Sequence, residues 1–365
     1  MRFNLPLPVW TIIAPIIAWI AYFSKNIGNS GLFLAVLAAI LILTVLAAVH
    51  HAEVVAHKVG EPFGTLILAL CVTIIELALI ITLMSAGGAQ TQTLARDTIF
   101  AANMIILTGI IGLCILIGGA KHREQFIVKH SATSALVALT AILVLTLVLP
   151  NYTISTPGPV YKSSQLIFVT VICIVLYAAF IMVQSVRHRD YFLPVDKNGT
   201  TLDEDGDGHA DPPSGKTTIF SLILLVACLG AVVLLAKVLS PSIEAGVQSI
   251  GAPDSLVGII IAMVILLPEG IAAIRNARKD RLQTSINLGL GSALASTGLT
   301  IPAVAIFSLY DNSTVFLGID TKSTVLLILS IFTVMLSLIT GKTNILYGIV
   351  LLVLFATYLF TTIVP

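Results

Sequence analysis

Two apolar stretches decide the fold: Leu66–Leu83, which reads LILALCVTIIELALIITL, and Leu256–Ile274, which reads LVGIIIAMVILLPEGIAAI. Each is close to the roughly 20 mainly apolar residues that a helix needs to cross a bilayer. Each also contains one carboxyl group, Glu76 in the first stretch and Glu269 in the second. No Lys or Arg lies in the middle of an apolar run to pair with them. A lone acidic side chain inside a membrane is costly, so it normally lines a cavity and has a function.

The composition around these stretches is that of a polytopic membrane protein. Of the 365 residues, 57% are hydrophobic and only 10% are charged, against about a quarter charged in soluble domains. These values exclude a soluble globular protein and an intrinsically disordered one. The net charge of +1 gives no basic excess for binding nucleic acid. Each of the four cysteines lies in an apolar run, which predicts small buried side chains rather than disulfides or metal ligands.

Breaks at charges, Pro and Gly predict eleven transmembrane helices and therefore an all-α polytopic membrane protein. The predicted spans are 9–23, 31–49, 65–85, 98–119, 132–149, 165–185, 217–237, 255–274, 284–308, 323–340 and 344–363. We expect the first span to be retained, because no small-residue cleavage site follows it. The N-terminus and the loops after the even-numbered spans hold 14 of the 19 basic residues. Because basic loops stay in the cytoplasm, the N-terminus is predicted to be cytoplasmic and the C-terminus to lie outside.

An internal repeat relates the two acidic spans. The residues that align at a constant offset of 191 are Glu53, His57, Val59, Gly60 and Pro62 with Glu244, Gln248, Ile250, Gly251 and Pro253. We therefore predict an N-terminal helix in 1–30, a five-helix repeat in 31–186, an acidic linker in 187–216 and a second five-helix repeat in 217–365. Because five is odd, the two repeats are inverted. Inverted repeats with acidic residues near the membrane midplane are an architecture of secondary transporters.

The neighbours of both glutamates offer oxygen ligands. Pro268 and Gly270 flank Glu269 and predict an interrupted helix with free carbonyl groups. The supporting cation site is predicted from polar residues of these spans and the spans that follow them, namely Thr73, Asn103, Ser292 and Ser296. For any single Ser or Thr, close helix packing is an equally good explanation.

Such a site suits a hard cation such as Ca²⁺ or Na⁺. Without a cation, low dielectric favours the protonated carboxyl group, so cations and protons compete for Glu76 and Glu269. Competition together with alternating access predicts a cation/proton antiporter and not an enzyme. The opposing interpretation is two protonated carboxyl groups that hold helices together. A membrane hydrolase lacks a supporting HExxH or GxSxG motif, and the inverted repeat argues against a channel.

These residues carry a family resemblance. The runs HHAEVVAHKVGEPFGTLILALCVTIIE (50–76) and ILLPEGIAAIRNARKDRLQTSINLGLGSALASTGLTIP (265–302) resemble Ca²⁺/cation antiporters of the calcium/proton exchanger branch, most closely the bacterial ChaA type. The resemblance covers essentially the whole chain, and it places the family's partner Asn on Asn103. One departure is that the branch's Gly-Asn-x-x-Glu reads Val72-Thr73-x-x-Glu76 and Ile265-Leu266-x-x-Glu269 here.

The resemblance implies export of Ca²⁺, with Na⁺ or K⁺, in exchange for H⁺ across a bacterial inner membrane, in alkaline or saline conditions. The alternative is a monovalent Na⁺(K⁺)/H⁺ antiporter in which Ca²⁺ is minor or regulatory. No cofactor is expected. The expected partners are inorganic cations, protons and the lipid bilayer, without nucleic acid, and a homo-oligomer is left open.

Two further groups of residues are candidates for regulation. Asp203, Asp205, Asp207 and Asp211 match part of an EF-hand loop, but the twelfth position is Ser214 instead of Glu. A cytoplasmic Ca²⁺ loop and a solvated acidic linker therefore both remain open. His50, His51 and His57 lie with Glu53 near the end of the second span. Histidine titrates near neutral pH, so pH sensing is one hypothesis, and ordinary interfacial histidines are the other.

Overall fold

The structure is a computed structural model that describes residues 7–24, 31–59, 63–87, 92–192, 213–249, 251, 253 and 255–364. Nearly all of this part of the chain is helical, as the sequence predicts. The α-helices are α1 (Val9–Phe23), α2 (Gly31–Val59), α3 (Phe63–Gly87), α4 (Leu94–Met104), α5 (Ile111–His122), α6 (Lys129–Leu143), α7 (Ser163–Met182), α8 (Gly215–Ser249), α9 (Ser255–Arg278), α10 (Leu282–Ala295), α11 (Ile301–Asp311), α12 (Thr321–Ile339) and α13 (Ile345–Ile363).

Shorter elements interrupt or join these helices. The π-helical segments are η3 (Ile105–Ile110), η4 (Val144–Val148), η6 (Val183–Arg187) and η9 (Ser296–Thr300). The 3₁₀ segments are η5 (Leu149–Tyr152) and η7 (Arg189–Phe192), and the strands are β1 (Gln125–Phe126) and β2 (Lys342–Thr343). Because the π segments continue the helices on either side of them, α4, η3 and α5 form one span, and so do α10, η9 and α11.

The chain is a multi-pass membrane protein. Among the described residues, nine helical stretches are long and apolar enough to cross a bilayer. The other two predicted spans, 9–23 and 65–85, coincide with shorter apolar helices at Val9–Phe23 and Ala69–Ser85. The polytopic helical fold is thereby confirmed, and the count of eleven spans stays a prediction.

Two of the helices continue well beyond their predicted ends. The second predicted span ends at residue 49, yet α2 continues to Val59, and the seventh ends at residue 237, yet α8 continues to Ser249. In α2 no Gly or Pro lies between residue 49 and Gly60, so the polar residues extend the helix instead of ending it. In α8 the helix also continues through Pro241.

The helix boundaries follow the repeat. Helix α2 ends at Val59 and its counterpart α8 at Ser249, while α3 begins at Phe63 and its counterpart α9 at Ser255. The π segments η3 and η9 begin at Ile105 and Ser296. Each pair is separated by the sequence offset of the repeat to within a single position. The offset therefore recurs in the secondary structure, including the two π-helical segments.

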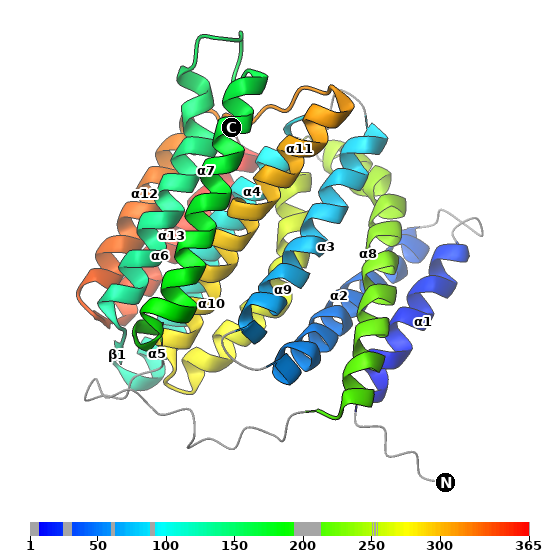
Figure 1. Ribbon diagram of the computed structural model, residues 1–365, viewed down its shortest axis with the longest axis horizontal. Coiled ribbons are helices and arrows are strands. Elements are labelled where there is room, and N and C mark those ends of the chain that lie inside the picture. The colour runs from blue at the N-terminus through cyan, green and yellow to red at the C-terminus, as the bar shows by residue number, and fades with distance from the viewer. Residues whose placement is uncertain are drawn as a thin grey trace. The chain divides into compact units, whose positions relative to one another are not determined.

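The chain packs as two compact units, and neither is a continuous segment. Unit 1 comprises Met1–Gly87 and Asp207–Asp254 and holds α1, α2, α3 and α8. Helix α1 contacts both α2 and α8, which lie side by side (Figure 1). The indole Nε1 of Trp19 donates to the carbonyl of Ala227 in α8 at 3.1 Å. At the other end of α1, a ring nitrogen of the buried His51 lies 3.1 Å from the carbonyl of Thr11.

Unit 2 comprises Gly88–Gly206 and Ser255–Pro365, and hydrogen bonds gather its loops at two ends. At one end β1 pairs with β2 in antiparallel register, with Gln125 opposite Thr343. The same end includes the end of α9, whose Ala277 carbonyl accepts from Gln125, and Phe192, whose carbonyl accepts from Asn287. We call this end the basic end, because the ends of α5 and α9 and the segments after α5, α9 and α12 contribute Lys121, Arg123, Arg278, Lys279, Arg281 and Lys342.

The opposite end of unit 2 joins different segments. Phe316 donates its backbone N–H to the Gln92 carbonyl at 3.1 Å, and Asn151 donates to the Ile319 carbonyl at 2.6 Å. This end collects the start of α4 and the segments after α6 and α11. Helix α5 therefore ends at the basic end, while α11, its counterpart at the repeat offset, ends at the opposite end, and the inversion of the repeats stays a prediction.

Candidate cation site

The carboxylate of Glu269 lies on α9 and is half-buried. Its Oε2 accepts a hydrogen bond of 2.5 Å from the hydroxyl of Ser292 on α10. A hydrogen bond to an ionised carboxylate is stronger than one between neutral groups, so Ser292 fixes the orientation of the carboxylate. The structure thus brings together two of the site residues that the sequence predicts.

A second polar contact joins a span of the first repeat to a span of the second. The amide of the fully buried Asn103 on α4 donates to the hydroxyl of Thr297 in η9 and to the carbonyl of Ile99, each at 2.8 Å. The other amide atom, the acceptor Oδ1, has no hydrogen-bond partner within the described part of the chain. A buried acceptor without a partner is costly, so this oxygen is available as a ligand. The buried hydroxyl of Thr300, one turn after Thr297, also has no hydrogen-bond partner within the described residues.

The predicted break at Pro268 is absent, because α9 continues as a helix from Ser255 to Arg278. Proline has no N–H group, so the carbonyl four residues earlier, on Val264, loses its usual helical donor without the helix ending. The irregular backbone lies instead in the neighbouring spans, as the π-helical segments η3 and η9. A π segment rotates the residues after it relative to those before it, and such segments are frequent at functional sites.

Each of these two π segments has a glycine that packs against an aromatic ring from the other half of the sequence. A Cβ atom on Gly109 in η3 would lie 3.5 Å from the ring of Phe355 on α13. A Cβ atom on Gly298 in η9 would lie 3.1 Å from the Cβ of Tyr177 on α7. The two contacts repeat one arrangement, since each joins a π segment to the last span of the opposite half.

Glu76 belongs to unit 1, whereas Glu269 belongs to unit 2. Glu76 lies on α3 and is 4% exposed, so its carboxyl group is removed from bulk solvent. Thr73, one turn earlier, is equally buried and donates its hydroxyl to the Ala69 carbonyl of its own helix at 2.9 Å. The hydroxyl oxygen keeps its acceptor capacity. That Glu76 and Glu269 share one cation stays a prediction, as does the part of Thr73.

Ser296, the fourth supporting residue, begins η9 and is 4% exposed. Its place in that span is one turn after Ser292. Its role as a ligand also stays a prediction.

The two candidate regulatory groups differ in what the structure describes. His50 lies 3.9 Å from the carboxylate of Glu53 and packs against the ring of Trp10, while His51 contacts α1 through Thr11. His57 lies in the last turn of α2. The structure therefore places His50 and His51 at the contact between α1 and α2. The partial Ca²⁺ loop, Asp203, Asp205, Asp207 and Asp211, lies outside the described residues.

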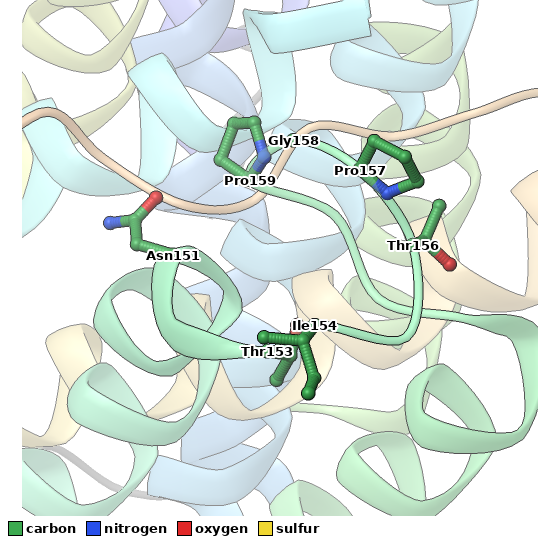
Figure 2. Close-up of a pocket in the computed structure, with 7 residues that line it drawn as sticks. All are labelled: Asn151, Thr153, Ile154, Thr156, Pro157, Gly158 and Pro159. Carbon is green, nitrogen blue, oxygen red and sulfur yellow. The ribbon is translucent and has the colours of Figure 1, made fainter.

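A shallow pocket in unit 2 involves none of the predicted site residues. It has a volume of about 590 Å³ and is formed by the segment after α6, from Asn151 to Pro159 (Figure 2). Its lining carries no charged side chain, and the amide nitrogen of Asn151 is already engaged with the Ile319 carbonyl. The pocket therefore offers no carboxylate for a cation.

Comparisons with known proteins agree with this geometry. The sodium/calcium exchanger protein family matches residues 29–186 and 220–364, which together cover most of the chain and leave out the linker. The chain belongs to this family.

Two relatives and two solved structures extend the comparison. The putative ionic transporter y4hA of Sinorhizobium fredii is 42% identical, with 98% of this chain and 97% of that protein covered. The sodium-potassium/proton antiporter ChaA of Escherichia coli is 32% identical, with coverages of 96% and 95%. The structure of native YfkE has a TM-score of 0.71 at 17% identity, covering 98% of this chain and 99% of that one. The crystal structure of the H⁺/Ca²⁺ exchanger CAX has a TM-score of 0.70 at 15% identity, covering 96% and 87%.

Membership of the exchanger family confirms the resemblance expected from the runs at 50–76 and 265–302. It makes the chain a secondary transporter rather than an enzyme. The donor set fits this class, because carboxylate, amide and hydroxyl oxygens are the ligands of hard cations. Among the described residues, no group of three or more His, Cys, Asp or Glu side chains is gathered as a transition metal would need.

The sequence predicts Asn103 and Ser292 as supporting residues of the cation site, and both are buried, but it does not single out Thr297 as the partner of Asn103. In a regular helix the side chains of Ser292 and Thr297 would point in different directions, because five residues turn the helix by about 500°. Thr297 lies within η9, and the formation of a π segment depends on tertiary packing rather than on a residue type. The only local signal is the glycine within each π segment.

Proposed function

We propose that this chain is a cation/proton antiporter that exports Ca²⁺, and also Na⁺ or K⁺, in exchange for H⁺ by alternating access. The observation that carries the proposal is the carboxylate of Glu269, oriented by Ser292 inside a membrane helix. Such a group binds either a cation or a proton, and low dielectric makes the two states compete. The relative from Escherichia coli is named a sodium-potassium/proton antiporter, and the solved relative CAX an H⁺/Ca²⁺ exchanger, which supports the same class of ions here.

The exchange follows from competition at two carboxyl groups. Glu76 and Glu269 together neutralise one divalent ion, and neutral oxygens complete its coordination. Thr73 supports Glu76, while Ser292 supports Glu269. Asn103 and Ser296 supply further oxygens from the spans with the π segments. When protons replace the cation, both carboxyl groups become neutral, and the empty site reorients without an uncompensated charge in the membrane.

The orientation in the membrane is inferred from charge. The basic end of unit 2 carries the six Lys and Arg residues named above, and positive loops stay in the cytoplasm. We assign this end to the cytoplasm of a bacterium and the chain to the inner membrane. The N-terminus is then cytoplasmic and the C-terminus periplasmic.

Two regulatory roles belong to the same proposal. His50, His51 and His57, with Glu53, lie on the part of α2 that meets α1 and continues to the helix end, so a change in their charge would act on that contact. The acidic linker, with Asp203, Asp205, Asp207 and Asp211, connects the two repeats and would bind Ca²⁺ weakly, because it lacks the twelfth-position Glu of an EF-hand. Deletion of 203–211 should raise the Ca²⁺ concentration for half-maximal exchange, and an unchanged value contradicts the Ca²⁺ loop.

Everted membrane vesicles test the main proposal. With a proton gradient imposed, addition of Ca²⁺, Na⁺ or K⁺ should dissipate the gradient, and Glu269→Gln and Glu76→Gln should each abolish this response. Each variant removes the charge and preserves the size of the side chain. Glu124→Gln is the matched control, because Glu124 is exposed at the basic end, and it should transport normally. Normal exchange in both Glu269→Gln and Glu76→Gln would contradict the proposal.

A further inference from the structure

The C-terminal end of α9 is capped by side chains from α5 and β1. Lys121 on α5 donates from Nζ to the carbonyl of Arg278, the last residue of α9, at 2.9 Å. Gln125 in β1 donates from Nε2 to the Ala277 carbonyl at 3.1 Å and to Oδ1 of Asp280 at 2.9 Å. The last carbonyls of a helix have no partner within their own helix, so donors from outside stabilise the helix end.

His122, the last residue of α5, lies between two oxygen acceptors of the same helix end. Its Nε2 is 3.2 Å from the carbonyl of Arg278, and its Nδ1 is 3.9 Å from Oδ2 of Asp280. The 3.9 Å contact with Asp280 is too long for a hydrogen bond and is an ion pair only when the imidazole is protonated. A charged ring therefore adds this ion pair to the contact with the Arg278 carbonyl, and a cation at a helix C-terminus is favourable in itself.

The turn after α9 is held in an unusual conformation by these contacts. Asp280 has a φ of 63°, in the left-handed region that residues other than glycine seldom adopt. Its backbone N–H donates to the Ala277 carbonyl, and its side chain is fixed by Gln125. Gln125 is buried, and its Oε1 lies directly against Gly118, where a Cβ atom would clash. A conformation of this kind persists only where its surroundings hold it.

The other charged groups around His122 are mostly cationic. Lys121 precedes it on α5 and Arg123 follows the helix end, and the turn after α9 adds Lys279 and Arg281. Glu124 is turned to Lys342 of β2, with 3.9 Å between the charged atoms. Asp280 is the carboxylate that lies against the His122 ring. The His122 ring therefore contacts one acidic side chain, Asp280, and one carbonyl at the end of α9, that of Arg278.

The cap acts on the helix that carries Glu269. Arg278 lies nine residues after Glu269, which is about 14 Å along the axis of α9. Near the other end of α9, Gly258 contacts the backbone of α4 at Asp97 and Thr98, so closely that a Cβ atom would lie 3.1 Å away. Helix α9 is thus fixed near both ends, and the fixation at its C-terminal end contains a titratable group.

We propose that His122 is a positioning residue for transport, which holds the end of α9 when protonated and loosens it when neutral. The proposal rests on the proposed function, because it concerns the movement of the helix that carries Glu269. Loss of the ring's charge removes the ion pair with Asp280 and leaves only the contact with the Arg278 carbonyl. Helix α9 then moves more readily, so the maximal exchange rate rises by about two- to fivefold, which is the factor expected for a charge at a helix C-terminus.

The test separates this effect from proton competition at Glu269. Competition at the cation site changes the half-saturating cation concentration, whereas the cap changes the maximal rate. Exchange by the full chain is measured at saturating cation in everted vesicles, with the external pH varied from about 5.5 to 8.5. The wild type should show the pH-dependent maximal rate. His122→Gln should be fast at all pH values, and His122→Arg, which keeps a charge, should be slow at all of them.

His130→Gln is the matched control. His130 is exposed at the same end and contacts Tyr191 instead of α9, so this variant should keep the wild-type pH profile. Retention of the wild-type profile by His122→Gln overturns the proposal, and so does a maximal rate in the wild type that is independent of pH. Absence of exchange in the wild type, or normal exchange in Glu269→Gln, indicates failure of the proposed function instead.

A second measurement does not depend on transport. In purified protein, the wild type should unfold at a higher temperature than His122→Gln at about pH 5.5, and the difference should vanish at about pH 8.5, since only the charged ring completes the cap. If the wild type and His122→Gln unfold at the same temperature at each of the two pH values, the proposed cap is wrong, whether or not exchange is detected.

Discussion

At the scale of single residues, the hydroxyl of Ser292 decides how Glu269 is held. It donates to the carboxylate at 2.5 Å, and a hydrogen bond to a charged group contributes about 1.5 to 3 kcal/mol. We expect Ser292→Ala to raise the half-saturating cation concentration by at least roughly tenfold, because the carboxylate loses the donor that orients it and favours its charged form. Cation titrations of exchange at fixed pH measure this shift.

Ser285 on the same helix provides the control for that prediction. It is also buried, but its hydroxyl donates to the backbone carbonyl of Ala273 at 2.7 Å. Ser285→Ala should lower the unfolding temperature and leave the half-saturating concentration unchanged. Equal shifts in cation affinity for the two variants would mean that the contact between Ser292 and Glu269 has no special part in binding.

At the scale of elements, the π segment η9 depends on Gly298. An alanine there would place its methyl group 3.1 Å from the Cβ of Tyr177, inside ordinary van der Waals contact at about 3.5 to 4.0 Å. We expect Gly298→Ala to destabilise the protein by about 1 to 3 kcal/mol and to slow exchange, because overpacking displaces α7 or the π segment. Thermal unfolding and the maximal exchange rate measure the two effects.

Gly291, which lies on α10 shortly before η9, provides the control for Gly298→Ala. Nothing lies within 4 Å of a Cβ atom at Gly291. Alanine generally stabilises a helix relative to glycine by about 0.5 to 1 kcal/mol, so Gly291→Ala should be neutral or stabilising. If both alanine variants behave alike, the contact between Gly298 and Tyr177 does not constrain η9.

The elements also show where sequence reasoning succeeds and where it stops. Apolar length identifies the spans, and the Gly-x-Pro positions of the repeat mark the ends of α2 and α8. A proline suggests a break at Pro268, yet the helix continues there and the irregular turns occur in η3 and η9. The difference is physical: a proline removes one hydrogen bond locally, whereas a π segment is selected by packing against rings from the other half of the chain.

At the scale of the whole molecule, the sequence predicts that the two halves of the chain are repeats of each other. The prediction comes from the constant offset between equivalent residues near the two acidic spans. The same relation recurs in the helix boundaries and in the two π segments, so it describes structure as well as sequence. The cap on α9 lies beyond such reasoning. His122 and Asp280 lie in different halves of the sequence and share no motif, and only the fold brings them together.

The inverted repeat makes a prediction about sidedness that labelling can test. Glu124 follows α5 at the basic end and has 59% of its side chain exposed, while Tyr310 near the end of α11 is 88% exposed at the opposite end. In a background without the four natural cysteines, Tyr310→Cys should react with a membrane-impermeant maleimide in intact cells, and Glu124→Cys only in everted vesicles. The reason is that α5 and α11 are repeat-related helices that end on opposite sides, with the basic end in the cytoplasm. Labelling of both cysteines from one side contradicts the inversion, whereas a reversed pattern keeps the inversion and reverses the assigned orientation.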